Sequence, residues 1–226
     1  MANNFQDGTG LLYLEKRTPI IDALFGAYRL RTYEDRQDVL AFSTEDEESD
    51  WDEVLARLLE VARAIGCVVT DEQSEDVGSV VAALGKFMGR KFTSVHGAIL
   101  HDTILAREPY DDSPCLESLF ALAHYLDDGH GLKAVEEEIA YTSDKMRVGN
   151  FGGSFGYTSI AYQLSIGTQT ACVRSRQVAA AISTDDDDAV AHAVLPFALD
   201  GLNFTDPAMR RRIKLKVAEL LLAQPE

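Results

Sequence analysis

The clearest helical pattern of the chain lies between residues 51 and 65. Apolar side chains recur there at spacings of three and four residues, namely at Val54, Leu55, Leu58, Leu59, Ala62 and Ile65. This spacing places them on one face of a helix. Ser49 or Asp50 can cap its start, and Gly66 suits its end. The pattern predicts an amphipathic helix from Trp51 to Ile65 that packs against a core.

Further helices are predicted from the same apolar spacing and from start signals. Thr18-Pro19 and Asp206-Pro207 each place a capping side chain before a proline, which suits the first helical position. Thr170 is expected to cap another helix. The predicted helical ranges are 19–28, 77–88, 93–106, 114–126, 170–182 and 207–221.

Strands are predicted where apolar and polar residues alternate. Residues 157–166 alternate strictly, which is typical of one half-buried strand. Shorter strands are expected at 10–15, 38–43 and 67–70. Residues 132–142 fit a helix or a strand, and we favour a strand because a glycine-rich strand follows. The order strand, helix, strand over residues 38–70 resembles a βαβ unit.

Four glycines precede the alternating segment, at positions 149, 152, 153 and 156. A phosphate-binding glycine loop should open a helix, whose first amides then face the phosphate. Here the glycines lead into a predicted strand. We therefore expect a glycine-rich bulge or turn that permits close approach of backbones, and no nucleotide site.

These elements predict an α+β fold: a single compact domain over residues 1–226, with a small mixed or antiparallel sheet packed with about six helices. A weak seam is expected near residues 107–114. The alternative is an α/β fold with a βαβ unit in the first half. A chain of 226 residues needs no disulfide or metal to fold. Three widely spaced cysteines (Cys67, Cys115 and Cys172) predict reduced, buried thiols.

The net charge of the chain has the largest effect on which partners are expected. The net charge is −16, from 37 acidic and 21 basic residues. Because phosphate binders and proteins of anionic membranes need a basic surface, partners of nucleic acid or membrane are not expected. Neither a signal peptide nor a transmembrane run is found, so a cytoplasmic protein is expected. The surplus of acid suits solubility, or electrostatic steering toward a basic partner protein.

One histidine pair carries candidate chemistry. His101-Asp102 resembles the core dyad of HD-domain phosphohydrolases, in which adjacent His and Asp bind a metal that activates water. The resemblance implies a metal-dependent phosphohydrolase, with His124 as a further ligand; Asp127, Asp128 and His130 could add to the set. The upstream histidine of that family has no counterpart before His96, so the hydrolase is the alternative.

The favoured interpretation is a binding protein with no cofactor and no catalytic residues. It is an acidic inhibitor of the immunity or antitoxin kind that blocks a basic partner, such as a toxin enzyme, with carboxylates. A homodimer is left open. The residues expected to bind the partner are Glu45, Asp46, Glu47, Glu48 and Asp50.

Overall fold

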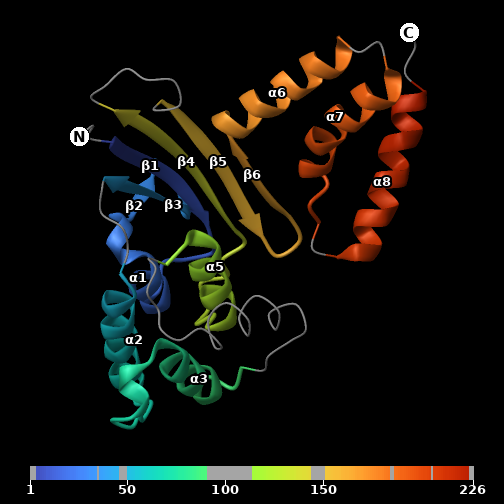
Figure 1. Ribbon diagram of the computed structural model, residues 1–226. Coiled ribbons are helices and arrows are strands. Elements are labelled where there is room, and N and C mark those ends of the chain that lie inside the picture. Colours follow the sequence, from blue (N-terminus) through green and yellow to red (C-terminus); the bar gives the residue numbers. More distant parts are fainter. Residues whose placement is uncertain are drawn as a thin grey trace. The chain divides into compact units, whose positions relative to one another are not determined.

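The computed structural model describes residues 4–34, 36–45, 50–90, 114–143, 151–183, 186–204 and 206–223. Its strands form a six-stranded antiparallel sheet in the order β2-β3-β1-β4-β5-β6 (Figure 1). The strands are β1 (Asn4–Tyr13), β2 (Arg31–Tyr33), β3 (Arg36–Glu45), β4 (Ala134–Ser143), β5 (Gly152–Ser159) and β6 (Gln163–Gly167). With the helices that accompany it, this sheet confirms the predicted α+β fold class.

Seven α-helices lie within the described residues, against about six expected for the whole chain. They are α1 (Pro19–Phe25), α2 (Trp51–Ile65), α3 (Val77–Phe87), α5 (Leu116–Tyr125), α6 (Thr168–Ile182), α7 (Asp187–Asp200) and α8 (Pro207–Leu222). Two 3₁₀ turns, Gly26–Tyr28 and Gln73–Glu75, complete the list. The helix predicted at 93–106 falls outside the described residues.

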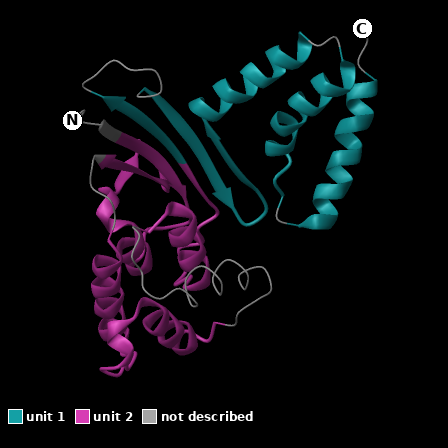
Figure 2. Ribbon diagram, viewed as in Figure 1, with its two compact units in different colours: residues 1–5, 137–226 teal, residues 6–136 magenta. Residues whose placement is uncertain are grey.

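The chain divides into two compact units, residues 6–136 and residues 1–5 with 137–226 (Figure 2). The division falls between Glu136 and Glu137, inside β4. The seam predicted near residues 107–114 lies almost wholly outside the described residues, and the single domain over 1–226 stays a prediction.

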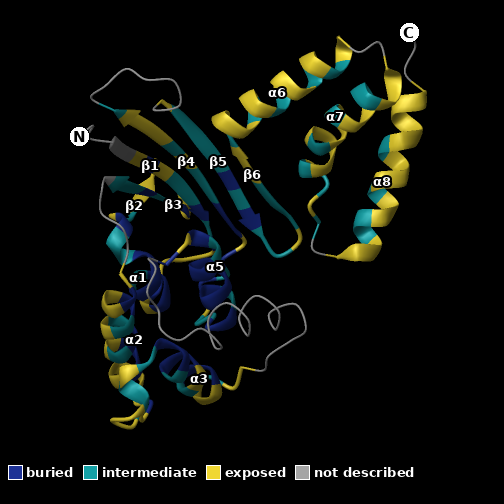
Figure 3. Cartoon of the chain, viewed as in Figure 1, coloured by how far each residue is buried: buried dark blue, intermediate teal, exposed yellow. Residues whose placement is uncertain are grey.

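The unit of residues 6–136 has a well-packed core. Within it α1 packs against α2 and α5, and α2 packs against α3. Of the predicted stripe of α2, Val54, Leu58 and Ala62 are buried, whereas Ile65 at its end is exposed. Helix α5 is buried on nearly every face (Figure 3). The largest fully buried side chains are Leu12, Leu14, Ile20, Ile21, Leu24, Phe25, Leu58, Leu84, Leu119 and Leu122.

Local chemistry fixes both ends of α2 where the sequence predicted them. Asp50 precedes the helix in an extended conformation, and its carboxylate accepts the backbone N–H of Asp52 at 2.9 Å. At the other end Gly66 is left-handed, with φ of 77°, and the N–H of Cys67 donates to the carbonyl of Ala62 at 2.8 Å. This is a Schellman ending, which stops the helix abruptly.

The strand predicted at residues 67–70 is wrong. The cap uses the amide of Cys67, and the chain then turns through residues 71–75 into α3, which Asp76 caps by accepting the N–H groups of Gly78 and Ser79. No strand follows α2 in the described residues between 66 and 90. The βαβ alternative is therefore wrong as well.

The alternating segment 157–166 forms two strands rather than one. It lies in an antiparallel hairpin of β5 and β6, in which Thr158 pairs with Gln163. Ser159 and Tyr162 close the turn: the N–H of Ser159 donates to the carbonyl of Tyr162 at 2.9 Å, and the Ser159 hydroxyl accepts the N–H of Tyr162 at 3.1 Å. The turn residues Ile160 and Ala161 carry no glycine or asparagine signal, so the alternation concealed the turn.

Strand was the correct choice for residues 132–142, since β4 occupies Ala134–Ser143. Gly152, Gly153 and Gly156 lie within β5, whereas Gly149 is outside the described residues. The register of β5 with β6 is regular from Ser154 to Thr158, so the predicted bulge or turn is not found there. A Cβ at Gly153 would lie 2.5 Å from the carbonyl oxygen of Ile139 in β4. Residue 153 therefore has to be glycine for two backbones to approach this closely.

The predicted cap at Thr170 is wrong, because α6 begins at Thr168 after Gly167.

Gly10 of β1 allows a prediction about this close packing. A Cβ there would overlap the carbonyl oxygen of Glu136 and the buried ring of Phe42, neither of which can withdraw. We expect Gly10→Ala to lower the free energy of unfolding by about 1–3 kcal/mol, the range for overpacked sites. Urea unfolding of purified protein measures this loss.

Gly26→Ala is the matched control. A Cβ at Gly26 meets only the guanidinium of Arg57, the far end of a flexible side chain, so we expect stability close to wild type. Equal losses in the two variants would contradict the close approach at Gly10.

Candidate functional site

The predicted acidic site lies between the end of β3 and the start of α2. Glu45 is the last residue of β3, and Asp50 is the N-cap of α2. Asp46, Glu47 and Glu48 fall outside the described residues. The fold thus brings the two ends of the predicted site to one short connection of residues 46–49.

Backbone register adds an acidic position that the sequence did not suggest. Asp7 of β1 is the direct partner of Glu45 of β3. Like charges at opposed positions of two strands destabilise a sheet unless a cation is near. This end of the sheet therefore holds one acidic position from β1 and one from β3.

The carboxylates of β3 and of the first turn of α2 differ in how far they are already paired. Glu53 of α2 accepts Arg57 at 2.5 Å. Near the start of β3, at the opposite end of the strand from Glu45, Asp38 accepts Arg36 at 2.8 Å. The hydrogen bond from Arg36 lowers the pKa of the exposed Asp38 carboxyl. Within the described residues Asp7 and Asp52 form no ion pair. Their charges remain available to a cation from outside the chain.

The residues proposed for the hydrolase are not brought together in the described part of the chain. His101 and Asp102 lie outside it. His124 is half-buried near the end of α5, with its ring 6.2 Å from the ring of Phe120. The metal ligand set of His101, Asp102 and His124 therefore stays a prediction.

A second group of possible metal ligands does come together, in the turn after α5. One ligand atom each of Asp127, Asp128 and His130 lies within 4.8 Å of the others. The His130 side chain is fully buried, whereas the two carboxylates are half-buried. The geometry alone would suit a cation.

Hydrogen bonds of His130 argue against a metal at this turn. Its Nδ1 accepts the backbone N–H of Leu132 at 2.8 Å, so its Nε2 carries the proton and donates to the carbonyl of Ala123 at 3.0 Å. A metal ligand needs a free nitrogen lone pair, and neither ring nitrogen has one. The buried ring instead ties the turn to α5.

The two carboxylates of the turn also accept hydrogen bonds from within the fold. Asp128 accepts the Thr18 hydroxyl at 2.5 Å and the N–H of Ile20 at 3.3 Å, which satisfies the start of α1. Thr18 was the predicted cap of this helix, but it makes no capping hydrogen bond of its own. A residue 110 positions away in the sequence provides the cap instead.

Asp127 stabilises the turn by accepting backbone amides. Its Oδ1 lies 2.9 Å from the nitrogen of Gly129 and 3.2 Å from that of Gly131, and both glycines are left-handed. Partial burial raises the pKa of the Asp127 carboxyl, but the N–H groups of Gly131 and Gly129 lower it more, so that it lies below its ordinary value. We name Asp127, Asp128 and His130 the turn lock.

The three cysteines are free, as predicted. Only Cys67 is buried, and burial raises the pKa of its thiol. Cys115 and Cys172 are exposed, so the expectation of buried thiols is wrong for both. Cys172 lies on α6, none of whose residues is buried, which explains its exposure.

Sequence reasoning missed a large apolar surface on the last three helices. None of the residues of α6, α7 and α8 is buried. The apolar spacing of α8 predicted a side formed by Met209, Ile213, Val217, Leu220 and Leu221. The first three are only half-buried, Leu220 is 52% exposed and Leu221 is 67% exposed. The described helices thus display the side chains that would ordinarily form a core.

No helix in the described part of the chain is both long enough and apolar enough to cross a membrane. Comparisons with family models, with curated proteins and with solved structures found no match for this chain.

The turn lock predicts a pH dependence of stability. Because the pKa of folded Asp127 is lower than that of the unfolded chain, its carboxylate stabilises the fold above the unfolded pKa of about 4. That contribution is lost as the pH falls through the folded pKa. We expect the loss of unfolding free energy between about pH 5 and pH 2 to be smaller in Asp127→Asn than in wild type.

Urea unfolding across this pH range measures the difference. Asp71→Asn, which removes an exposed carboxylate outside the turn, controls for the change in net charge. An acid-side slope of Asp127→Asn identical to that of wild type would contradict the role of the turn lock.

Proposed function

We propose that the protein is a binding protein, an acidic inhibitor of the immunity or antitoxin kind that acts in the cytoplasm on a basic partner such as a toxin enzyme. The observation that carries the proposal is the uneven distribution of charge. Residues 6–136 hold 26 acidic and 12 basic residues, a net charge of −14, whereas the rest of the chain holds 11 and 9, a net charge of −2.

This distribution favours partner binding over general solubility. A surplus that serves only to keep the protein dispersed has no reason to concentrate in one unit. A surplus of acid that steers a cationic partner is expected to concentrate in one unit, because the attraction is then directed to one surface. The segment from Glu45 to Asp50 is the densest acidic stretch of that unit, with five acidic residues in six positions.

Local structure supports the same segment. Its ends are held by β3 and by the cap of α2, so the acidic residues are presented by elements that pack on the core. Asp7 and Glu45 are direct partners in the register of β1 and β3, so this edge carries acidic positions on two adjacent strands. A cationic partner gains electrostatically from such an edge.

Charge reversal tests the proposal. The variant changes Glu45, Asp46, Glu47 and Glu48 to lysine and keeps Asp50, because loss of the cap would weaken α2. The probe is the basic product of a gene adjacent to that of this protein. Losing about 1 kcal/mol for each close charge pair would weaken binding of the order of a thousandfold over four positions. Titration calorimetry at low and high salt measures it.

The control reverses four exposed acids of the same unit, Glu60, Asp71, Glu72 and Glu75, so that the net charge matches. We expect the control to bind nearly as wild type does. Equal weakening in both variants would reduce the effect to net charge, and tight binding by the reversed variant would refute the proposed site.

The metal-dependent phosphohydrolase remains the alternative, with His101, Asp102 and His124 as ligands. Metal analysis of the purified protein distinguishes the two functions. The proposed inhibitor should hold no stoichiometric metal. Zinc, manganese or iron at one equivalent or more in wild type, lost in His101→Ala, would favour the hydrolase and count against the inhibitor.

A further inference from the structure

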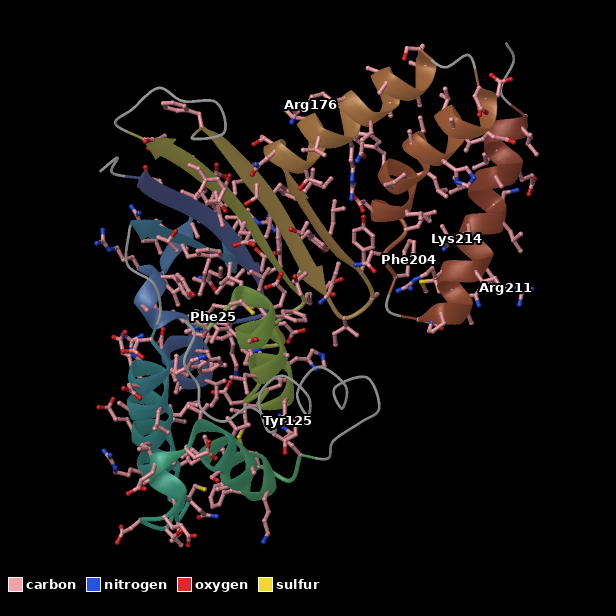
Figure 4. All side chains as sticks on the ribbon, viewed as in Figure 1. Phe25, Tyr125, Arg176, Phe204, Arg211 and Lys214 are labelled. Carbon is pink, nitrogen blue, oxygen red and sulfur yellow. The ribbon has the colours of Figure 1, made fainter. Side chains whose placement is uncertain are left out.

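The exposed side of α8 combines positive charge with apolar side chains. Arg211, Leu215, Ala218 and Leu222 follow one another at spacings of four, three and four, so they lie on one helical stripe, and all four are exposed. Lys214 is also exposed and follows Arg211 by three residues, about one helical turn; both are labelled on α8 in Figure 4. Met209, Ile213 and Val217, which are half-buried, form the opposite stripe. We call the exposed set the α8 stripe.

The exposed side of α7 has the same layout with the opposite charge. Asp188, His192, Leu195 and Leu199 recur at spacings of four, three and four, and all are exposed. Leu195 and Leu199 are 46% and 40% exposed. Asp187 precedes the stripe in the first turn, where Asp186 caps the helix. We call this set the α7 stripe.

The two stripes match when the helices run parallel. Asp188 then faces Arg211 at the first position, and Leu199 faces Leu222 eleven residues later in each helix. Charge meets opposite charge in the first turns, and apolar side chains meet in the last turns. Helices with complementary flanking charges and an apolar seam associate in this way.

The described residues leave both charged ends without a partner in the chain. Neither Arg211 nor Lys214 forms an ion pair among them, and the same holds for Asp187 and Asp188. Arg174 of α6, by contrast, pairs with Asp200 and lies over the ring of Phe197.

Chain direction prevents the parallel match within one chain. After α7 the chain passes through residues 201–206 and turns back, so α8 runs roughly opposite to α7 (Figure 1). Arg210 fixes this return by donating to the carbonyl of Phe204 just before the helix. The basic start of α8 therefore lies by the end of α7 and away from its acidic start.

We propose that a second copy of this chain covers this surface, with the α7 stripe of each copy against the α8 stripe of the other. The contact is self-complementary, so two such helix pairs form under one two-fold axis and the assembly closes as a dimer. Each pair neutralises a cluster of like charge and removes exposed leucines from water. The proposal uses none of the residues 45–50 and stands apart from the inhibitor function.

Mass measurement is the first test. Sedimentation equilibrium should give twice the chain mass of 24.8 kDa for wild type. Arg211→Glu with Lys214→Glu places acid against acid and should be a single chain at the same concentration. Asp187→Lys with Asp188→Lys places base against base and should also be a single chain. Asp186 stays unchanged because it caps α7.

Mixing the two variants is the decisive experiment. In the mixed pair, both the unchanged and the reversed stripes meet opposite charge, so we expect a dimer with one copy of each variant. That outcome also shows that both variants are folded. A variant of Arg176, an exposed cation on α6 outside both stripes, serves as control and should dimerise as wild type does.

Three results would overturn the proposal. The first is a wild-type chain that is monomeric at every accessible concentration. The second is a dimer that both charge reversals leave intact. The third is a mixture of the two variants that stays monomeric although a chain carrying all four reversals has the mass of the wild-type dimer. The partner surfaces would then differ from the two stripes.

Discussion

The structure depends on where apolar side chains leave water, and they do so unevenly. Every buried apolar side chain among the described residues lies between Leu12 and Val135. Among the described residues from 137 to 223, only Gly156 and Thr158 are buried. Isolated helices of about 15 residues are marginal in water, because nucleation is costly and most helical stability comes from packing. Helices α6 and α7 contact one another and the hairpin of β5 and β6. No residue of α6, α7 or α8 is buried, however, so these helices gain less from packing than the helices of residues 6–136 do.

Polar contacts with long sequence separation complete the packing of residues 6–136. The turn lock satisfies the start of α1 through Asp128, and a fully buried imidazole bridges Leu132 and Ala123. The carbonyl of His130 also accepts the N–H of Glu15 at 2.7 Å. Because a buried polar group costs free energy unless it is paired, such a network is stabilising only when every member is satisfied. The same residues resemble a metal site in composition, but their hydrogen bonds show that they connect the turn to α5 and to the start of α1.

Sequence patterns predicted what local physics decides. The stripe, cap and glycine of α2 fixed its bounds to the residue, because each signal acts within one helix. Three features could not be found in this way, one because its partner is distant in sequence and two because apolar spacing does not reveal the hydrogen bonds of a helix end or a turn. The cap of α1 comes from Asp128, the amide of Cys67 is consumed by the helix end, and the turn at Ile160 is defined by pairing of β5 with β6. Of the candidate site, the location between β3 and α2 was predictable, whereas Asp7 entered only through strand register. Leu220 and Leu221 of α8 were expected to be buried, and no signal within the helix indicates that they are exposed.

Two surfaces with different chemistry follow from this division. The acidic edge near Glu45 and Asp50 suits a cationic partner, and the stripes of α7 and α8 suit a second copy. Amide hydrogen exchange on protein diluted until its mass is that of one chain tests the division most directly, because it reports the free energy of local opening along the chain. The account predicts that amides of α6, α7 and α8 exchange far faster than those of α5 in the single chain, and that they slow when the partner surface is present. Exchange in the single chain as slow in α8 as in α5 would contradict it.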